Sequence, residues 1–109
     1  MNIDNIGTIC VVGWGRSGVS LCELILTIGK KVKVSESLAE SKFSLEQIKF
    51  YKDKGVEFEF SAHTKEFISQ SQLLVVSPGV DLFNSKIGQI AQGLRSEEHT
   101  SELQSLLII

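Results

Sequence analysis

Three glycines near the N-terminus constrain the fold of this 109-residue chain more than any other feature. Gly13, Gly15 and Gly18 have the spacing G-x-G-x-x-G and directly follow TICVV, a short β-branched run at residues 8–12. Beyond them, apolar side chains recur at helical spacing, which indicates an amphipathic helix over about residues 17–28. The segment is therefore predicted to form a buried strand, a tight glycine loop and a helix.

The alternation of strand-like and helix-like patterns continues along the chain. Strands that alternate with helices are joined by right-handed crossovers and form a parallel sheet. We therefore expect an α/β fold, a Rossmann-like open parallel sheet with flanking helices. The expected strands are residues 8–12, 32–34, 56–60 and 73–77, and the expected helices are residues 17–28, 45–54, a short turn near 63–68 and a last helix from about residue 84.

The glycine loop has the features of an anion site. The first helical N–H groups have no partner within the helix, and the helix dipole adds about half a positive charge there. Gly13 permits the tight turn, Gly15 removes a side chain where a diphosphate approaches, and Gly18 lets the helix pack against the strand. Ser17 can add a hydroxyl donor, whereas Arg16 can reach either a phosphate or the solvent.

Two further features fall at the same edge of the predicted sheet, because ligands of open parallel sheets bind outside the carboxyl ends of the strands. Glu36 ends the second strand, where an acidic side chain accepts hydrogen bonds from ribose hydroxyls, and Ser37 follows it. The alternative for Glu36 is a solvated charge. Ser77, Pro78 and Gly79 follow the fourth strand, and their alternative is a simple turn.

Other chemically distinctive side chains are given ordinary roles. Trp14 lies inside the glycine loop and is expected to be partly exposed beside the ligand. His63 has no Cys or His partner at metal spacing, so a surface or capping role is favoured and no metal site is expected. Cys10 and Cys22 are interpreted as small buried hydrophobic residues in a reducing compartment.

Charge and hydropathy exclude several classes of protein. Basic and acidic side chains balance over residues 1–94, and there is no basic stripe, so a nucleic-acid partner is not expected. The apolar runs are too short for a membrane span, and MNIDNIGTIC is unlike a secretory signal. We therefore expect a cytoplasmic protein.

The C-terminal segment has a different origin from the rest. Residues 95–105, RSEEHTSELQS, match residue for residue an in-frame translation of a common sequencing adapter. We therefore expect one domain over residues 1–94 and an adventitious tail over residues 95–109, which is excluded from the fold. The alternative is a natural amphipathic tail.

Four segments together resemble the N-terminal domain of the Mur ligases. They are VVGWGRSGVS, KVKVSES, VEFEF and LLVVSPGV, in this order, and the resemblance covers residues 6 to about 93. SPGV is similar to the members that add D-glutamate to UDP-N-acetylmuramoyl-L-alanine in peptidoglycan synthesis. Because the sheet of this family continues further, the resemblance implies a truncated domain.

The resemblance also implies a substrate site for UDP-N-acetylmuramoyl-L-alanine. Two departures from the family are Leu38, where some relatives have a basic residue, and Glu36, which is often Asp. By position, the diphosphate would contact Gly15, Arg16, Ser17 and Gly18, the uridine would contact Glu36 and Ser37, and Ser77 to Gly79 would line the crevice near the sugar.

The family reaction is an ATP-driven amide formation that needs ATP and Mg²⁺. The chain has no G-x-x-x-x-G-K-[ST] motif, so we expect a monomeric, substrate-binding fragment without catalytic residues, bound cofactor or ligase activity of its own. Two alternatives remain: an NAD-binding Rossmann domain of a dehydrogenase or regulatory protein, and a nucleotide-sensing module without catalysis.

Overall fold

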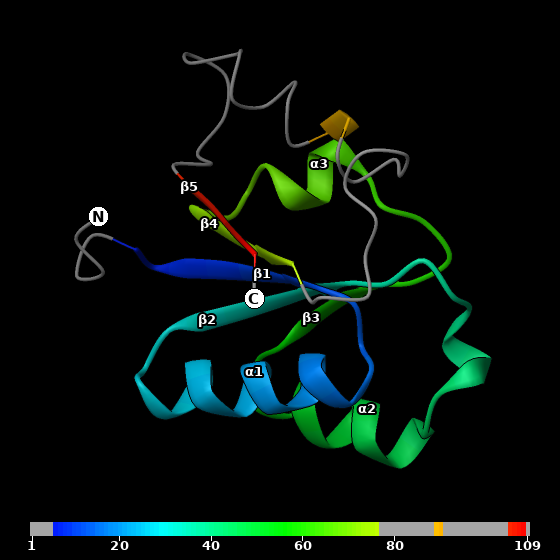
Figure 1. Cartoon of the computed structure of the whole chain (residues 1–109). Helices are drawn as coiled ribbons and strands as arrows, with labels where there is room; N and C mark the ends of the chain where they lie inside the picture. The colour runs from blue at the N-terminus through cyan, green and yellow to red at the C-terminus, as the bar shows by residue number, and fades with distance from the viewer. Residues whose placement is uncertain (1–5, 77–88, 91–104, 109) are drawn as a thin grey trace.

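A computed structural model of the chain describes residues 6–76 and 89–90, and the backbone of residues 105–108. It contains a parallel sheet with the strand order β3-β2-β1-β4-β5 (Figure 1). The predicted α/β, Rossmann-like fold is confirmed. The elements are β1 (Thr8–Val12), α1 (Arg16–Thr27), β2 (Lys31–Ser35), the 3-10 turn η2 (Glu40–Lys42), α2 (Leu45–Lys52), β3 (Glu57–Glu59), α3 (Lys65–Ile68), β4 (Leu73–Val76) and β5 (Ser105–Ile108).

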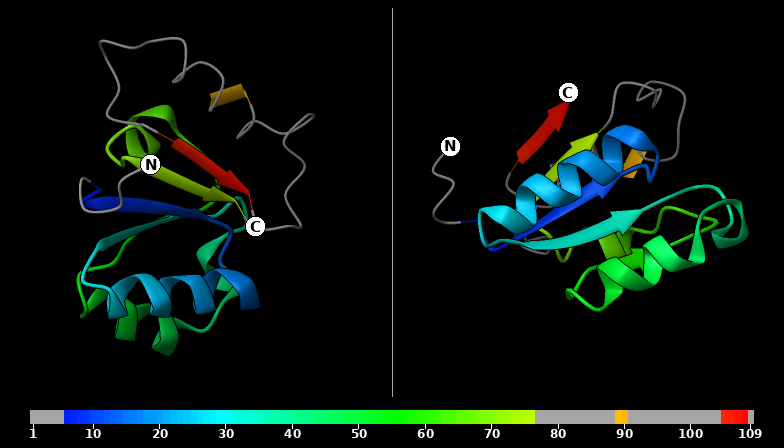
Figure 2. Two further views of the ribbon diagram at one scale, coloured as in Figure 1. Left: turned by 60° about the vertical axis from the view of Figure 1, so that its left-hand side comes forward. Right: turned by 90° about the horizontal axis from the view of Figure 1, so that it is seen from below.

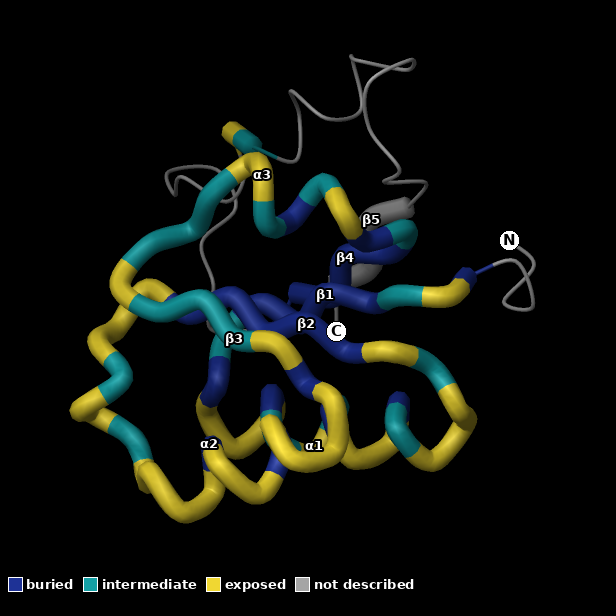
Figure 3. The backbone as a smooth tube through the Cα atoms, turned by 180° about the vertical axis from the view of Figure 1, so that it is seen from behind, coloured by how far each residue is buried: buried dark blue, intermediate teal, exposed yellow. Residues whose placement is uncertain are grey.

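The sheet separates two layers of helices. Helices α1 and α2 cover one face and α3 covers the other, as the two views of Figure 2 show. Alternate residues of each strand face opposite layers, so Ile9 and Val11 of β1 pack toward α1 while Cys10 and Val12 pack toward α3. Strands β1, β2 and β4 are buried along most of their length, whereas the residues of β3 are exposed or half-buried. Exposed residues gather on the outer surfaces of α1 and α2 (Figure 3).

Helix α1 connects β1 to β2 across one face of the sheet. Its buried side is formed by Gly18, Cys22 and Ile25. At its C-terminus the N–H of Gly29, at φ 82°, donates to Leu26 O at 3.0 Å, and the N–H of Lys30 donates to Ile25 O at 3.2 Å. These two bonds form a Schellman motif, which places the chain for entry into β2.

Three of the predicted elements are longer than those observed. Helix α2 ends at Lys52 rather than at residue 54, and β3 and β4 occupy residues 57–59 and 73–76, whereas β2 extends one residue beyond each end of the predicted 32–34. Within α2, Phe50 and Leu45 are exposed while Ile48 and Tyr51 are buried. The expected last helix, from about residue 84, lies outside the described residues except for 89–90, which are helical.

Part of the expected adventitious tail lies beside the sheet. The backbone of Ser105–Ile108 pairs in parallel with β4, from Leu73↔Ser105 to Val76↔Ile108. The division into a domain over residues 1–94 and a tail over residues 95–109 stays a prediction. An edge strand exposes unpaired N–H and C=O groups that accept any extended segment. SLLI is apolar enough to occupy that edge whatever its origin.

Candidate functional site

The glycine loop joins β1 to α1 and touches the end of β2. Gly13 has φ 99°, which a side chain would strain, and its N–H donates to Ser35 O at 2.8 Å. A Cβ on Gly18 would lie 2.0 Å from Gly13 O, so only glycine permits this approach of helix to loop. A Cβ on Gly15 would meet nothing within 4 Å. The tight turn and the close packing predicted for Gly13 and Gly18 are confirmed.

The N-terminus of α1 faces open space. Gly15, Arg16 and Ser17 are exposed, whereas Gly18 is buried. Within the described residues no side chain caps this helix, and its first turn holds no acidic residue. The first amides of a helix have no acceptor inside it, so the loop offers N–H donors and a positive dipole end to an anion. Binding of a diphosphate there stays a prediction.

Glu36 lies beside this loop but is neither solvated nor free. Its side chain is buried, with 7% of its surface exposed. Oε1 accepts from the N–H of Trp14 at 2.8 Å, and Oε2 accepts from the N–H of Leu38 at 2.6 Å and from Ser37 Oγ at 3.3 Å. Glu36 is therefore bonded mainly to backbone donors from the glycine loop and from its own strand exit.

The environment of Trp14 differs from the expectation. It is 1% exposed and belongs to the core, so the predicted partial exposure beside a ligand is wrong. Its ring meets Tyr51 edge-on at 5.2 Å and Phe58 at 4.9 Å between centroids. Among the described residues, its Nε1 is buried without a hydrogen-bond partner. The Trp14 ring is buried because Tyr51 and Phe58, which are distant in sequence, provide apolar surroundings for it.

The remaining predicted residues divide into two groups. Ser37 is exposed at the same edge as Glu36, and the structure thus brings the β2 exit and the glycine loop together. Ser77, Pro78 and Gly79 lie outside the described residues. The strand before them ends at Val76, whose partner in the register is Val12, next to Gly13.

A polar cluster at the carboxyl ends of β2 and β3 was missed by sequence analysis. Ser35 Oγ donates to Glu59 Oε2 at 2.8 Å and lies 2.6 Å from His63 Nδ1. Because Ser35 has a single hydroxyl proton, His63 Nδ1 donates the other bond. Glu59 also accepts from Thr64 N at 3.1 Å and from Thr64 Oγ1. His63 is thus part of a polar network on the α3 side of the sheet, and not simply a surface residue.

The thiols of Cys10 and Cys22 and the hydroxyl of Tyr51 have raised pKa values. Burial raises the pKa of Cys10 and of Cys22 to about 12, so both remain thiols, as expected for buried hydrophobic residues. Burial also raises the pKa of Tyr51 to about 12, assisted by the hydrogen bond from its hydroxyl to Glu23 Oε1 at 2.7 Å. This bond ties α2 to α1 beneath the Trp14 ring.

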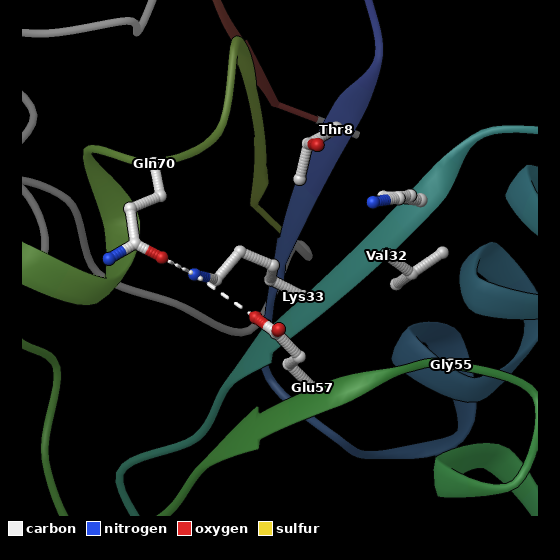
Figure 4. Close-up of a pocket in the computed structure, with 7 residues that line it drawn as sticks. Thr8, Val32, Lys33, Gly55, Glu57 and Gln70 are labelled. Atoms are coloured by element: carbon white, nitrogen blue, oxygen red, sulfur yellow. Dashed lines mark hydrogen bonds and ion pairs between the residues drawn. The ribbon is translucent and has the colours of Figure 1, made fainter.

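A cavity of about 370 Å³ lies at the opposite edge of the sheet, around the amino ends of the strands (Figure 4). Lys33, 4% exposed, crosses it. Its Nζ donates to Gln70 Oε1, pairs with Glu57 Oε2 at 3.3 Å and lies 4.1 Å from the centroid of Phe67. These contacts stabilise the charge of the ammonium group. The cavity lies at the opposite ends of the strands from the glycine loop and is therefore a separate feature.

In the described part of the chain, no group of three or more His, Cys, Asp or Glu side chains is arranged to hold a metal ion. In the same residues, no helix combines the length and apolar character that crossing a membrane requires.

Solved structures share this fold. An imine reductase from Myxococcus stipitatus in complex with NADP+ matches 94% of this chain and 31% of its own, with a TM-score of 0.53 and 25% identity. Malate dehydrogenase from Plasmodium falciparum matches 91% of this chain and 36% of its own, with a TM-score of 0.53 and 19% identity. The second likeness shows the fold alone.

Sequence comparisons are more specific. UDP-N-acetylmuramoylalanine–D-glutamate ligases of Koribacter versatilis and of Thermoanaerobacter sp. are each 32% identical, over 74% and 82% of this chain. The chain spans 18% and 19% of these two relatives. The family described as "Mur ligase MurD-like, N-terminal domain" matches residues 7–95, ending where the adapter-like segment begins. The chain therefore belongs to the MurD-like N-terminal domain family of the Mur ligases.

Proposed function

We propose that this chain is the substrate-binding domain of a ligase that adds D-glutamate to UDP-N-acetylmuramoyl-L-alanine in peptidoglycan synthesis. The family match supports the ligase parent. The observation that carries the binding role is the uncapped N-terminus of α1, beside a glycine with open space where its Cβ would be. Such a helix end stabilises a diphosphate by backbone hydrogen bonds and by its dipole.

The site is composed of three segments at the carboxyl edge of the sheet. The amides and side chains of residues 15–18 would bind the diphosphate, with the Arg16 guanidinium adding charge. The uridine would lie toward Glu36 and Ser37, at the end of β2. Ser77, Pro78 and Gly79 would line the crevice near the sugar. The exposure of Gly15, Arg16 and Ser17 supports this arrangement.

The rest of the reaction belongs to the parent enzyme. It would use ATP and Mg²⁺ to convert the substrate carboxylate into an acyl phosphate, which the D-glutamate amine attacks. Residues 1–94 supply substrate binding only, so the fragment is inactive as a ligase. We place it in the cytoplasm as a monomer, and we take residues 95–109 as an adventitious tail.

A titration of the ¹⁵N-labelled chain tests this proposal. UDP-N-acetylmuramoyl-L-alanine should shift the amide resonances of residues 15–18 and of Glu36 and Ser37 in a saturable manner, and UDP should shift part of the same set. A response to NAD alone would instead favour a nicotinamide-binding domain. No response to any of the three ligands would reject nucleotide binding by this chain.

A matched pair of glycine variants locates the site. Gly15→Ala adds a methyl group where the diphosphate would approach, and should weaken binding at least about tenfold, on the order of 1.4 kcal/mol. Gly7→Ala is the control, because its Cβ would make only an ordinary contact of 3.5 Å with Gln72 at the other end of β1. Equal affinities for the two variants would remove the glycine loop from the site.

A further inference from the structure

The carboxylate of Glu36 is almost fully used by groups of the chain itself. A carboxylate has about four acceptor positions on its two oxygens. The N–H groups of Trp14 and Leu38 and the hydroxyl of Ser37 occupy three of them. At most about one position remains for a ligand, so direct contact with a nucleotide cannot be the main use of this side chain.

The charge of Glu36 is stabilised by backbone dipoles rather than by a cation. The ion pairs among the described residues join Lys33 to Glu57 and Lys52 to Glu40, and neither includes Glu36. Hydrogen bonds from backbone N–H groups to a buried carboxylate are charge-assisted and stronger than those to a neutral oxygen. The two short bonds at 2.8 and 2.6 Å therefore hold two loops against each other.

The residue that Glu36 holds is itself anchored on the other side. Trp14 donates its N–H to Glu36, while its ring lies edge-on to Tyr51 and Phe58 in the core. The next residue, Gly15, occupies the N-cap position of α1. Trp14 is therefore held twice, by its backbone N–H and by its ring. Because it directly precedes the N-terminus of α1, it fixes the glycine loop next to the first amides of that helix.

We propose that Glu36 is a positioning residue, which fixes the glycine loop through the amide of Trp14 so that the first amides of α1 are presented to an anion. The identity of that anion rests on the proposed function, whereas the positioning role does not. The acid at the end of β2 thereby acts on the ligand through the loop. Ser37 is exposed beside it, and its hydroxyl oxygen, whose proton is donated to Glu36, can still accept a hydrogen bond from a sugar or a base.

Amide hydrogen exchange in the ligand-free chain tests this role. Glu36→Gln keeps the side-chain shape but removes the negative charge and one of the two acceptor oxygens. Even if the remaining amide oxygen stays on the Trp14 N–H, that bond is no longer charge-assisted and is about half as strong. We therefore expect exchange of the Trp14 amide to accelerate at least about fivefold. Unchanged exchange at Trp14 in a folded Glu36→Gln chain would overturn the proposal.

Glu59→Gln is the matched control. Glu59 is also a carboxylate at this end of the sheet, but it bonds Ser35 and Thr64 rather than the glycine loop. We expect it to change Trp14 exchange by less than about threefold, a difference below the value of one such bond. Equal acceleration in both variants would mean general loosening and would also contradict the proposal.

A measurement on the unaltered chain covers the case in which Glu36→Gln fails to fold. A scalar coupling across the hydrogen bond, between the Trp14 amide nitrogen and the Glu36 carboxylate carbon, should be detectable in ¹⁵N,¹³C-labelled protein. Its absence would overturn the proposal without any variant.

Titration with UDP-N-acetylmuramoyl-L-alanine then separates the two ideas. If positioning matters for binding, Glu36→Gln should weaken it at least about tenfold, and Glu36→Asp, which keeps both acceptors, should restore part of the loss. If Glu36→Gln binds as well as the unaltered chain, the link from positioning to binding is wrong. If the unaltered chain does not bind, the proposed function fails, and the exchange data still decide the role of Glu36.

Discussion

Among the described residues, the two edges of the sheet each bury one charged side chain, and the chain stabilises the two charges in opposite ways. At the carboxyl edge, Glu36 is held mainly by backbone N–H groups of two loops. At the amino edge, Lys33 is held by the side chains of Glu57, Gln70 and Phe67. The first arrangement shapes the backbone of a loop, whereas the second only neutralises a cation. The difference indicates that the carboxyl edge, and not the amino edge, presents backbone donors to a ligand.

The largest effect should come from crowding the carboxyl edge. Gly18→Ala places a Cβ 2.0 Å from Gly13 O, a backbone atom that cannot move without displacing the loop. We expect a loss of about 3 kcal/mol or more in the free energy of unfolding, measured by urea titration with circular dichroism. Gly7→Ala, at the amino edge, should change it by less than about 1 kcal/mol. Similar midpoints for the two variants would refute the packing described for Gly18.

Removing each buried charge compares the two edges directly. Glu36→Gln replaces two charge-assisted hydrogen bonds from backbone N–H groups with at most one neutral bond, and should cost about 1.5–3 kcal/mol. Lys33→Met should cost less than about 1 kcal/mol, because its partners Glu57 and Gln70 are exposed and water can solvate them. Urea unfolding of both variants provides the measurement, and a larger loss for Lys33→Met would reverse the comparison.

Alkaline pH should weaken the core on both faces of the sheet, because Tyr51 packs in one cluster and Cys10 in the other. The pKa of Cys10 is raised from 9.0 to about 12 and that of Tyr51 from 10.0 to about 12, both chiefly by burial. The unfolded chain therefore releases these protons at lower pH than the folded chain, and the free energy of unfolding falls as the pH rises from about 9 to 12. Below pH 9 this stabilisation is fully present.

Tyr51→Phe isolates one contribution to that dependence. The variant loses the hydrogen bond to Glu23 and should be about 0.5–1.5 kcal/mol less stable at pH 8. It should also show a shallower decline between pH 10 and 12, because one titrating group is gone. Urea unfolding at several pH values checks both effects, and an unchanged slope would show that Tyr51 titrates normally in the folded chain.

The smallest effect is expected from removing the tail. Within the described residues, the backbone of residues 105–108 pairs with β4, whereas the glycine loop is held by β1, β2 and Glu36. Deletion of residues 95–109 should therefore change substrate affinity by less than about threefold, within what a distant surface change produces. Calorimetric titration measures this, and abolished binding would show that the tail belongs to the functional domain.

The fold and the glycine loop could be predicted because their causes are local. Alternating apolar patterns determine the order of strands and helices, and the roles of Gly13 and Gly18 follow from strand–loop–helix geometry alone. The exposure of Phe50 on the second helix could not be predicted, because tertiary packing and not periodicity decides which apolar residues face the sheet.

The errors at the site come from partners distant in sequence. Trp14 was placed beside the ligand because nothing near it reveals that Tyr51 and Phe58 surround its ring. The role of His63 depends on Ser35, which reaches it only because β2 and β3 pair in a register that aligns Ser35 with Glu59. The sequence did contain a signal for this contact. Ser35 lies at the end of one strand and His63 follows the next strand, and parallel pairing of the two strands brings them together.

One titration tests the central claim most directly. When UDP-N-acetylmuramoyl-L-alanine is added to the ¹⁵N-labelled chain, the largest saturable shifts should fall on the amides of residues 15–18, with Lys33 and Gln70 unaffected. Saturable shifts confined to the amino-edge cavity around Lys33, with residues 15–18 unmoved, would contradict the account.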